Sequence, residues 1–220
     1  FFFNGGAGTA FPGEKDVCVP SLKGVSFERN PEMSLAAVAR EVSGGIREGF
    51  DFILANFANG DVIGHTANTQ AKVECAGHVS RHLGQVTGQA VQAGYAVLIT
   101  ADHGNLEEIL TADGKPHVAH TANPVRLVLA GAGEQVRLRD GILADVAPTV
   151  LSLLGIAQPA GMEGSSLLTG EAESKKVMLI VLDGWGIGSA DANDAIFLGD
   201  TPEWDALLKS NPHSSLFASG

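Results

Sequence analysis

The sequence is poor in the residues that crosslink chains or carry positive charge. Only two of the 220 residues are cysteines and they form no CxxC pair, which argues against a disulfide framework and a thiolate metal site. Fourteen basic residues against 25 acidic ones give a net charge of −11, which disfavours a nucleic-acid partner. No apolar run reaches the roughly 18 residues of a membrane span, and no basic leader precedes the first apolar run. We therefore expect a cytoplasmic protein that binds neither nucleic acid nor membrane.

Apolar residues make up 45% of the chain, which is ordinary for a globular domain of this length. Four nearly continuous apolar runs predict buried strands of a parallel sheet. They span residues 50–58, 95–101, 125–132 and 177–184, with shorter candidates at 1–6 and 16–21. Helical patterns lie between them, at residues 31–49, after Thr69 and at 145–155. This alternation predicts an α/β fold with a mostly parallel central sheet and helices on both faces.

Three of the predicted strands are followed by acids and imidazoles. Ligands of open α/β sheets bind beyond the carboxyl ends of the strands, so these side chains are candidates for one shared site. They are Asp61 and His65 after the first run, Asp102 and His103 after the second, and Asp183 after the last. The loop before residues 125–132 adds His117 and His120, of which His117 is the weaker candidate and is expected outside the ligand set.

The chemistry of these groups indicates a metal site. Carboxylates and imidazoles without thiolates suit Mn²⁺, Zn²⁺ or Fe²⁺. Five or more such groups exceed what one ion usually takes from protein, and two ions about 4 Å apart are a common device for phosphoryl transfer.

Two other motifs carry less weight. His78 and His82 have the i, i+4 spacing of a helical metal site, but they lie off the apolar stripe and we expect them to be solvated. The glycines of "DGWGIG" follow a strand, but their spacing does not match the dinucleotide-binding pattern.

Several stretches of the chain resemble one enzyme family. Residues 1–173 contain "FFFNGG", "DFILANFANGDVIGHTAN", "ITADHGNLEE" and "AHTANPV", which resemble the C-terminal part of cofactor-independent phosphoglycerate mutase. Residues 174–220, with "KKVMLIVLDGWGIG", resemble the N-terminal part of that family. The resemblance implies a single phosphatase-like domain over residues 1–220, with the three-layer sandwich of the alkaline phosphatase superfamily. It also implies a glycolytic isomerase that interconverts 3-phosphoglycerate and 2-phosphoglycerate.

The resemblance further implies two bound Mn²⁺ ions, with Zn²⁺, Co²⁺ or Mg²⁺ as possible substitutes. The ligands it assigns are Asp61, His65 and His120 to one ion, and Asp183, Asp102 and His103 to the other. In the family, a serine completes the second site and carries the phosphoryl group as phosphoserine between the two hydroxyls of glycerate.

The chain departs from the family pattern in three ways. The two segments are in permuted order, and the polar stretch at residues 168–176 looks like their join. No stretch matches the family's serine segment, so no catalytic nucleophile is assigned. The family's phosphotransferase domain is also missing between the segments.

These departures leave three functions open for the chain. The first is the metal-binding domain of a mutase, acting on phosphoglycerate or another small phosphate ester and not competent alone. The second is a weak phosphohydrolase that uses metal-bound hydroxide, and the third is an inert metal-binding module. We expect a monomer in each case.

Overall fold

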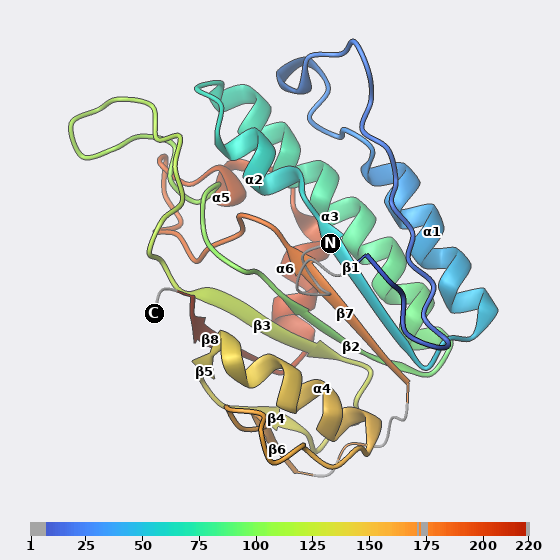
Figure 1. Cartoon of the computed structure of the whole chain (residues 1–220). Coiled ribbons are helices and arrows are strands. Elements are labelled where there is room, and N and C mark those ends of the chain that lie inside the picture. The colour runs from blue at the N-terminus through green and yellow to red at the C-terminus, as the bar shows by residue number, and fades with distance from the viewer. Residues whose placement is uncertain (1–7, 171, 173–175, 219–220) are drawn as a thin grey trace.

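The computed structural model describes residues 8–170, 172 and 176–218. Its core is a six-stranded sheet in the order β1-β7-β2-β3-β8-β5, and a two-stranded sheet pairs β4 with β6 (Figure 1). The strands are β1 (Phe52–Phe57), β2 (Tyr95–Thr100), β3 (Val125–Ala130), β4 (Arg137–Leu138), β5 (Gly141–Ile142), β6 (Leu168–Thr169), β7 (Lys176–Leu182) and β8 (His213–Phe217).

Helices occupy the connections between the strands. The α-helices are α1 (Leu35–Glu48), α2 (Asn59–Gly64), α3 (Thr69–Gln92), α4 (Val146–Leu154), α5 (Ala195–Leu198) and α6 (Pro202–Ser210), with short 3₁₀ turns η1 (Phe27–Arg29) and η2 (Leu143–Asp145). Local signals explain the boundaries of several helices. The Asn68 side chain caps α3 by accepting from the Ala71 N–H at 3.1 Å. Gly49 and Gly155 end α1 and α4 in the left-handed conformation, which glycine adopts without a Cβ penalty.

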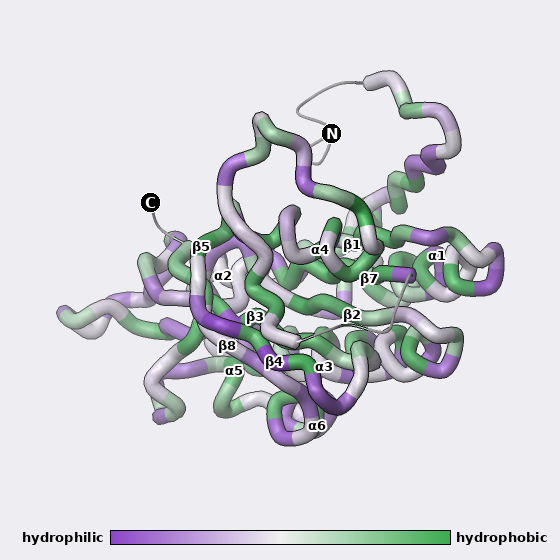
Figure 2. The backbone as a smooth tube through the Cα atoms, turned by 90° about the horizontal axis from the view of Figure 1, so that it is seen from below, coloured by the Kyte–Doolittle hydropathy of each residue, from purple (hydrophilic) through white to green (hydrophobic). Residues whose placement is uncertain are grey.

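The sheet is the middle layer of three. Helices α1, α3 and α6 cover one face, and α4 lies on the other (Figures 1 and 2). The central strands are the most apolar part of the backbone in Figure 2, and every residue of β2 is buried. The buried stripe of α3, which includes Val79, Leu83 and Val86, packs into this core as the sequence pattern predicts. The predicted α/β fold with a mostly parallel sheet is confirmed.

The last predicted strand occupies a central position in the sheet. β7 pairs in parallel with β1 on one side and with β2 on the other. Its side chains Val177, Met178 and Ile180 are fully buried. Residues from the final quarter of the chain therefore separate two strands that come from its first half.

The structure differs from the sequence predictions at β3. This strand is buried and nearly continuous in apolar residues, as predicted, but it runs antiparallel to both β2 and β8. A fully apolar strand indicates burial on both faces, not direction, because side chains face both layers in either orientation.

Further differences concern the short candidates and the helical histidines. Residues 16–21 form no strand, residues 1–6 lie outside the described residues, and the expected linker at 168–176 begins with β6. The prediction that both helical histidines are solvated is wrong for His82, which is buried and lies 2.7 Å from a carboxylate oxygen of Glu32.

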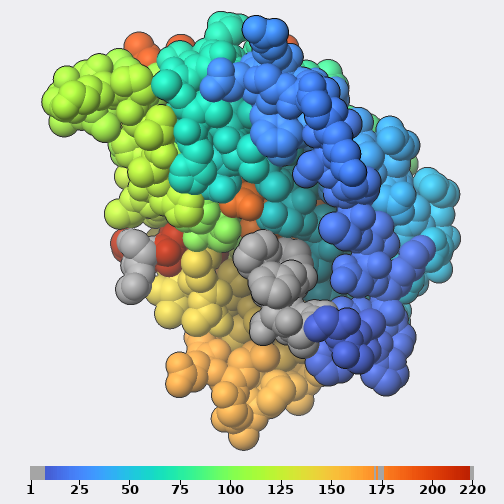
Figure 3. Space-filling model, turned by 45° about the horizontal axis from the view of Figure 1, so that its top comes forward, coloured from blue at the N-terminus to red at the C-terminus, as the bar shows by residue number. Residues whose placement is uncertain are grey.

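Residues 8–34 run along the outside of the molecule with little regular structure. They appear as the dark-blue ridge on one side of Figure 3. Two hydrogen bonds anchor the C-terminal end of this segment, because the buried Asn59 amide donates to the carbonyl oxygens of Pro31 and Glu32, each at 2.9 Å. Asn59 is the first residue of α2, so the same bonds position the helix that carries Asp61.

No helix among the described residues has both the length and the apolar character needed to cross a membrane.

The central position of β7 makes a prediction about stability. We expect Met178→Ala to lower the free energy of unfolding by roughly 2–5 kcal/mol, because a cavity forms in the middle of the sheet. Leu22→Ala is the control, since this side chain is 40% exposed, and it should change stability by less than about 0.5 kcal/mol. Urea unfolding curves measure both effects, and equal losses in the two variants would contradict the assigned role of β7.

Candidate metal centre

Parallel pairing brings three strand ends to one edge of the sheet. In the observed register, Leu182 of β7 lies beside Phe57 of β1, and Val181 lies beside Thr100 of β2. The chain leaves all three strands at that level. The candidate residues follow at once, with Asp61 in α2, His65 at the end of α2, Asp102 and His103 after β2, and Asp183 after β7.

His120 reaches the same edge because β3 is reversed. The chain leaves β2 at this edge and re-enters β3 at the same edge, so the connection from 101 to 124 begins and ends beside the other strand ends. An isolated bridge between Gly104 and Thr121 folds this connection back on itself. His120 is thereby carried to within 2.9 Å of Asp61, measured from its Nε2 to Oδ1.

One group of ligand atoms surrounds Asp61. Its Oδ1 lies 2.9 Å from the Nε2 atoms of both His65 and His120, and the two Nε2 atoms are 3.2 Å apart. His103 borders the group, with its ring stacked on that of His120 at 3.6 Å between centroids. Its Nε2 lies 3.8 Å from the same Asp61 oxygen.

A second group shares His103 with the first. The His103 Nε2 lies 3.4 Å from Oδ1 of Asp183 and 3.6 Å from Oδ2 of Asp102. The ligand atoms of these three residues are all within 4.8 Å of one another, as are those of Asp61, His103 and His120. All six residues chosen from the sequence thus lie in two adjoining groups.

Backbone carbonyls orient two of the imidazoles. The Nδ1 of His65 lies 2.8 Å from the Val118 carbonyl oxygen, and the Nδ1 of His103 lies 3.2 Å from that of Gly104. A carbonyl oxygen only accepts, so Nδ1 carries the proton in both rings. Each Nε2 therefore faces the carboxylates, which is the arrangement typical of metal-binding histidines.

Asp183 is the most enclosed carboxylate of the second group. Burial raises its pKa, and the negative charges of Asp102 and Asp61 raise it further, while the Asn56 amide at 3.0 Å opposes the rise. Carboxylates gathered in this way repel one another unless a cation lies between them.

Two glycines allow the first and last segments of the site to touch. A Cβ on Gly60 would collide with the carbonyl oxygen of Asp183. Gly184 has φ +75°, and a Cβ there would lie 2.6 Å from the backbone nitrogen of Asp61. The backbones that carry Asp61 and Asp183 therefore meet directly, with no side chain between them.

His117, which we expected outside the ligand set, lies beside the site without joining either group. Its carbonyl oxygen accepts from the Lys72 ammonium at 2.6 Å. Lys72 is buried, and that burial lowers its pKa to about 8 although the charge of Glu107 opposes the shift. Lys72 thus fastens the loop that carries His120 to α3.

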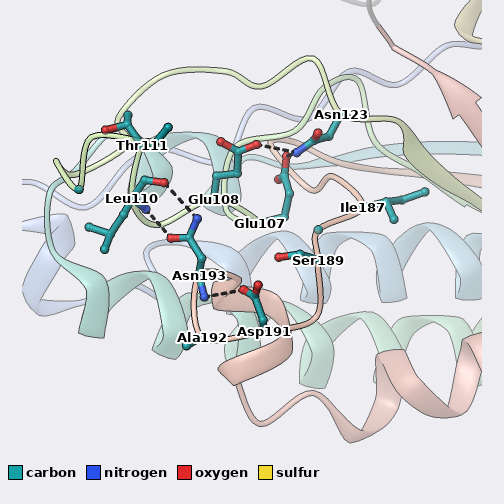
Figure 4. Close-up of a pocket in the computed structure, with 13 residues that line it drawn as sticks. Glu107, Glu108, Leu110, Thr111, Asn123, Ile187, Ser189, Asp191, Ala192 and Asn193 are labelled. Carbon is teal, nitrogen blue, oxygen red and sulfur yellow. Dashed lines mark hydrogen bonds between the residues drawn. The ribbon is translucent and has the colours of Figure 1, made fainter.

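A pocket of about 780 Å³ opens beside this loop (Figure 4). Glu107, Glu108 and Asn123 lie on one side of it, and Asn193 closes another side by pairing with the backbone of Leu110. Asn193 accepts from the Leu110 N–H at 2.7 Å and donates to its carbonyl at 3.0 Å. The segment after β7 and the loop after β2 are therefore joined on this side as well.

The geometry agrees with a comparison against known protein families. The model of the metalloenzyme superfamily matches residues 1–158. The chain belongs to the metalloenzyme superfamily. This superfamily match covers the segments that carry five of the six candidate ligands, all except Asp183.

The relatives within the superfamily agree with the resemblance read from the motifs. A 2,3-bisphosphoglycerate-independent phosphoglycerate mutase of Akkermansia muciniphila is 46% identical over 171 residues, which are 77% of this chain and 33% of that protein. The enzyme of the same name from Syntrophotalea carbinolica is 46% identical over 171 residues, covering 76% and 33%. The chain spans about a third of the length of these relatives.

A solved structure supports the fold. Phosphoglycerate mutase of Leishmania mexicana, crystallised at low cobalt concentration, superposes with a TM-score of 0.60 and 28% identity. The match covers 70% of this chain and 31% of that one.

The sequence reasoning missed the residues that hold the ligands in place. Asn56 donates to Asp183, and Asn105 donates to Asp61 at 3.4 Å. Glu107 and Lys72 were missed as well. Lys72 had a signal, since a lysine within the apolar stripe of a helix must find a buried partner. Asn105 and Glu107 lie directly after the His103 motif, but nothing in their spacing indicates where they point.

The contact between Gly184 and Asp61 can be tested with a matched glycine. Gly114 has φ +77° and open space around its Cβ position, so Gly114→Ala should cost only the backbone strain of roughly 1–2 kcal/mol. Gly184→Ala carries the same strain plus a collision with the Asp61 backbone, and should lose roughly a further 1–3 kcal/mol. Thermal unfolding of both variants measures the difference, and equal destabilisation would refute the close contact.

Proposed function

We propose that this chain is the metal-binding phosphatase domain of a cofactor-independent phosphoglycerate mutase, which interconverts 3-phosphoglycerate and 2-phosphoglycerate through a phosphoserine. The observation that carries the proposal is the pair of adjoining carboxylate and imidazole groups at the ends of three parallel strands. The mutase relatives and the superposition on the Leishmania mexicana enzyme support it. The cytoplasmic location and monomeric state remain predictions.

The donor set fits two divalent ions. Asp61, His65 and His120 would hold one ion, and the Oδ1 of Asp61 and the two imidazole Nε2 atoms lie within 3.2 Å of one another. The second ion would take the group of Asp102, His103 and Asp183. Oxygen and nitrogen donors without sulfur suit Mn²⁺, with Zn²⁺, Co²⁺ and Mg²⁺ as substitutes. When bound, such ions neutralise phosphoryl oxygens and lower the pKa of an attacking hydroxyl.

The chain's own residues keep this edge ready for a phosphate ester. Lys72 fastens the loop of His120, Asn56 orients Asp183, and the carbonyls of Val118 and Gly104 fix the tautomers of His65 and His103. Each restraint is a hydrogen bond between groups of the chain itself, and ligands that are held in this way need little reorganisation to receive an ion or a substrate.

We also propose that residues 174–220 correspond to the N-terminal segment of the family in permuted order. The place of β7 between β1 and β2 supports this assignment, since the segment supplies a strand and Asp183 without which the sheet and the second group are incomplete.

Metal loading tests the proposal. Saturating Mn²⁺ should bind at two ions per chain and raise the melting temperature, since an ion at 100 times its Kd adds about 2.7 kcal/mol of stability. Asp102→Asn should reduce the stoichiometry to one, because Asp102 belongs only to the second group. Asp113→Asn is the control, an exposed acid outside both groups. Elemental mass spectrometry measures the number of ions per chain, and thermal melts measure the melting temperature. A melting temperature that does not change with Mn²⁺ would refute the site.

A second expectation concerns turnover. The 220 residues contain no stretch that matches the serine segment of the family, so this polypeptide should bind the ions without interconverting the phosphoglycerates. A coupled assay of 2-phosphoglycerate formation, with an intact mutase as the positive control, measures this. Mutase turnover at the rate of the intact enzyme would show that another group of this chain accepts the phosphoryl group.

A further inference from the structure

Glu107 is a buried carboxylate at the centre of the loops that carry the candidate ligands. It is only 1% exposed and accepts four hydrogen bonds. Its Oε2 accepts from the Asn105 N–H at 2.8 Å and from the Gly186 N–H at 3.0 Å. Its Oε1 accepts from the Thr121 hydroxyl and from the Asn123 amide at 3.1 Å.

The four donors come from three segments that are separate along the chain. Asn105 follows His103 by two residues, and Gly186 follows Asp183 by three. Thr121 is the residue directly after His120. One side chain therefore ties together the loop after β2, the loop after β7 and the segment that follows His120. Each of its bonds is made within three residues of a candidate ligand.

The arrangement favours a carboxylate. All four partners donate to Glu107, and the backbone N–H groups of Asn105 and Gly186 can do nothing else, so the Oε2 end must accept. A carboxylate accepts at both ends and makes charge-assisted bonds, which no amide or hydroxyl side chain of similar size does. Glycines make room for the acid, because a Cβ on Gly104 or on Gly186 would collide with the Glu107 carboxylate. The loops are thus packed against this group as well as bonded to it.

We infer that Glu107 is a positioning residue that holds Asp183, His103 and His120 at the separation two adjoining metal sites need. The inference rests on the proposed function, because positioning has a purpose only if these groups bind ions. Hydrogen bonds to the supports of metal ligands commonly change metal affinity by 10- to 100-fold when they are removed.

The test compares Glu107→Gln with the matched control Glu108→Gln. Glutamine has the same shape but no charge, and its NH₂ group cannot accept. The N–H groups of Asn105 and Gly186 therefore either lose their acceptor or bond to a neutral oxygen, which is a weaker acceptor than a carboxylate. Glu108 is half-buried, and its Oε1 accepts a bond from the same Asn123 amide at 3.0 Å. Thr121→Val keeps the shape of the side chain and removes only the hydroxyl that donates to Glu107. This variant replaces Glu107→Gln in the test if Glu107→Gln does not fold.

Two readouts separate positioning from folding. In the metal-free protein, amide hydrogen exchange at Asn105 and Gly186 should be at least tenfold faster in Glu107→Gln than in the wild type or in Glu108→Gln. With Co²⁺ as the probe, affinity should fall roughly 10- to 100-fold. The visible absorption at saturating Co²⁺, which reports ligand geometry, should also change. Thr121→Val should shift both readouts in the same direction by less.

The outcomes distinguish this inference from the proposed function. Unchanged amide exchange would refute the tie between the segments. Faster exchange with unchanged Co²⁺ affinity and spectrum would refute the positioning role while leaving the metal site intact. If the wild-type protein binds no Co²⁺ or Mn²⁺, the proposed function fails and the positioning role fails with it, while amide exchange still shows whether Glu107 joins the three segments.

Discussion

The parallel register of β1, β7 and β2 is the constraint on which the candidate site depends. Because the three strands run in the same direction and end at the same level, the residues that follow them have no route except past a common edge. The ligand candidates lie at different distances beyond the strand ends, with Asp183 directly after β7 and Asp61 four residues after β1. Short α2 supplies the turn that brings Asp61 back to the edge. A slip of one residue in the pairing would point the strand side chains to opposite faces and separate the groups.

Much of this arrangement could be predicted from the sequence, for identifiable reasons. Buried strands and the apolar stripe of α3 leave periodic patterns, and an acid or imidazole directly after such a strand is exceptional enough to notice. The direction of β3 could not be predicted, because a strand buried on both faces has the same pattern in either orientation. The burial of His82 was missed for a similar reason, since its partner Glu32 lies 50 residues away in the chain.

The ligands were easier to predict than the groups that support them. Asp102 and His103 are easily noticed, because an acid and an imidazole side by side are unusual directly after an apolar strand. Glu107 is distinctive only through its four partners, which come from segments up to 79 residues away and meet it only after folding. Backbone donors such as those of Asn105 and Gly186 leave no trace in the residue types at all. A sequence therefore reveals the groups that do chemistry sooner than the hydrogen bonds that hold them.

The central position of β7 also has a consequence in time. A ribosome releases β1 and β2 long before β7, yet these two strands are not paired with each other and have a vacant place between them until β7 arrives. During synthesis the nascent chain thus carries two apolar strands with unpaired edges, which is the condition under which strands pair with the wrong chain. The sheet is complete only when β7 has paired with β1 and β2, and contacts between residues so far apart in the sequence form slowly. The late place of β7 in the chain thereby leaves an interval in which the growing chain is exposed to aggregation.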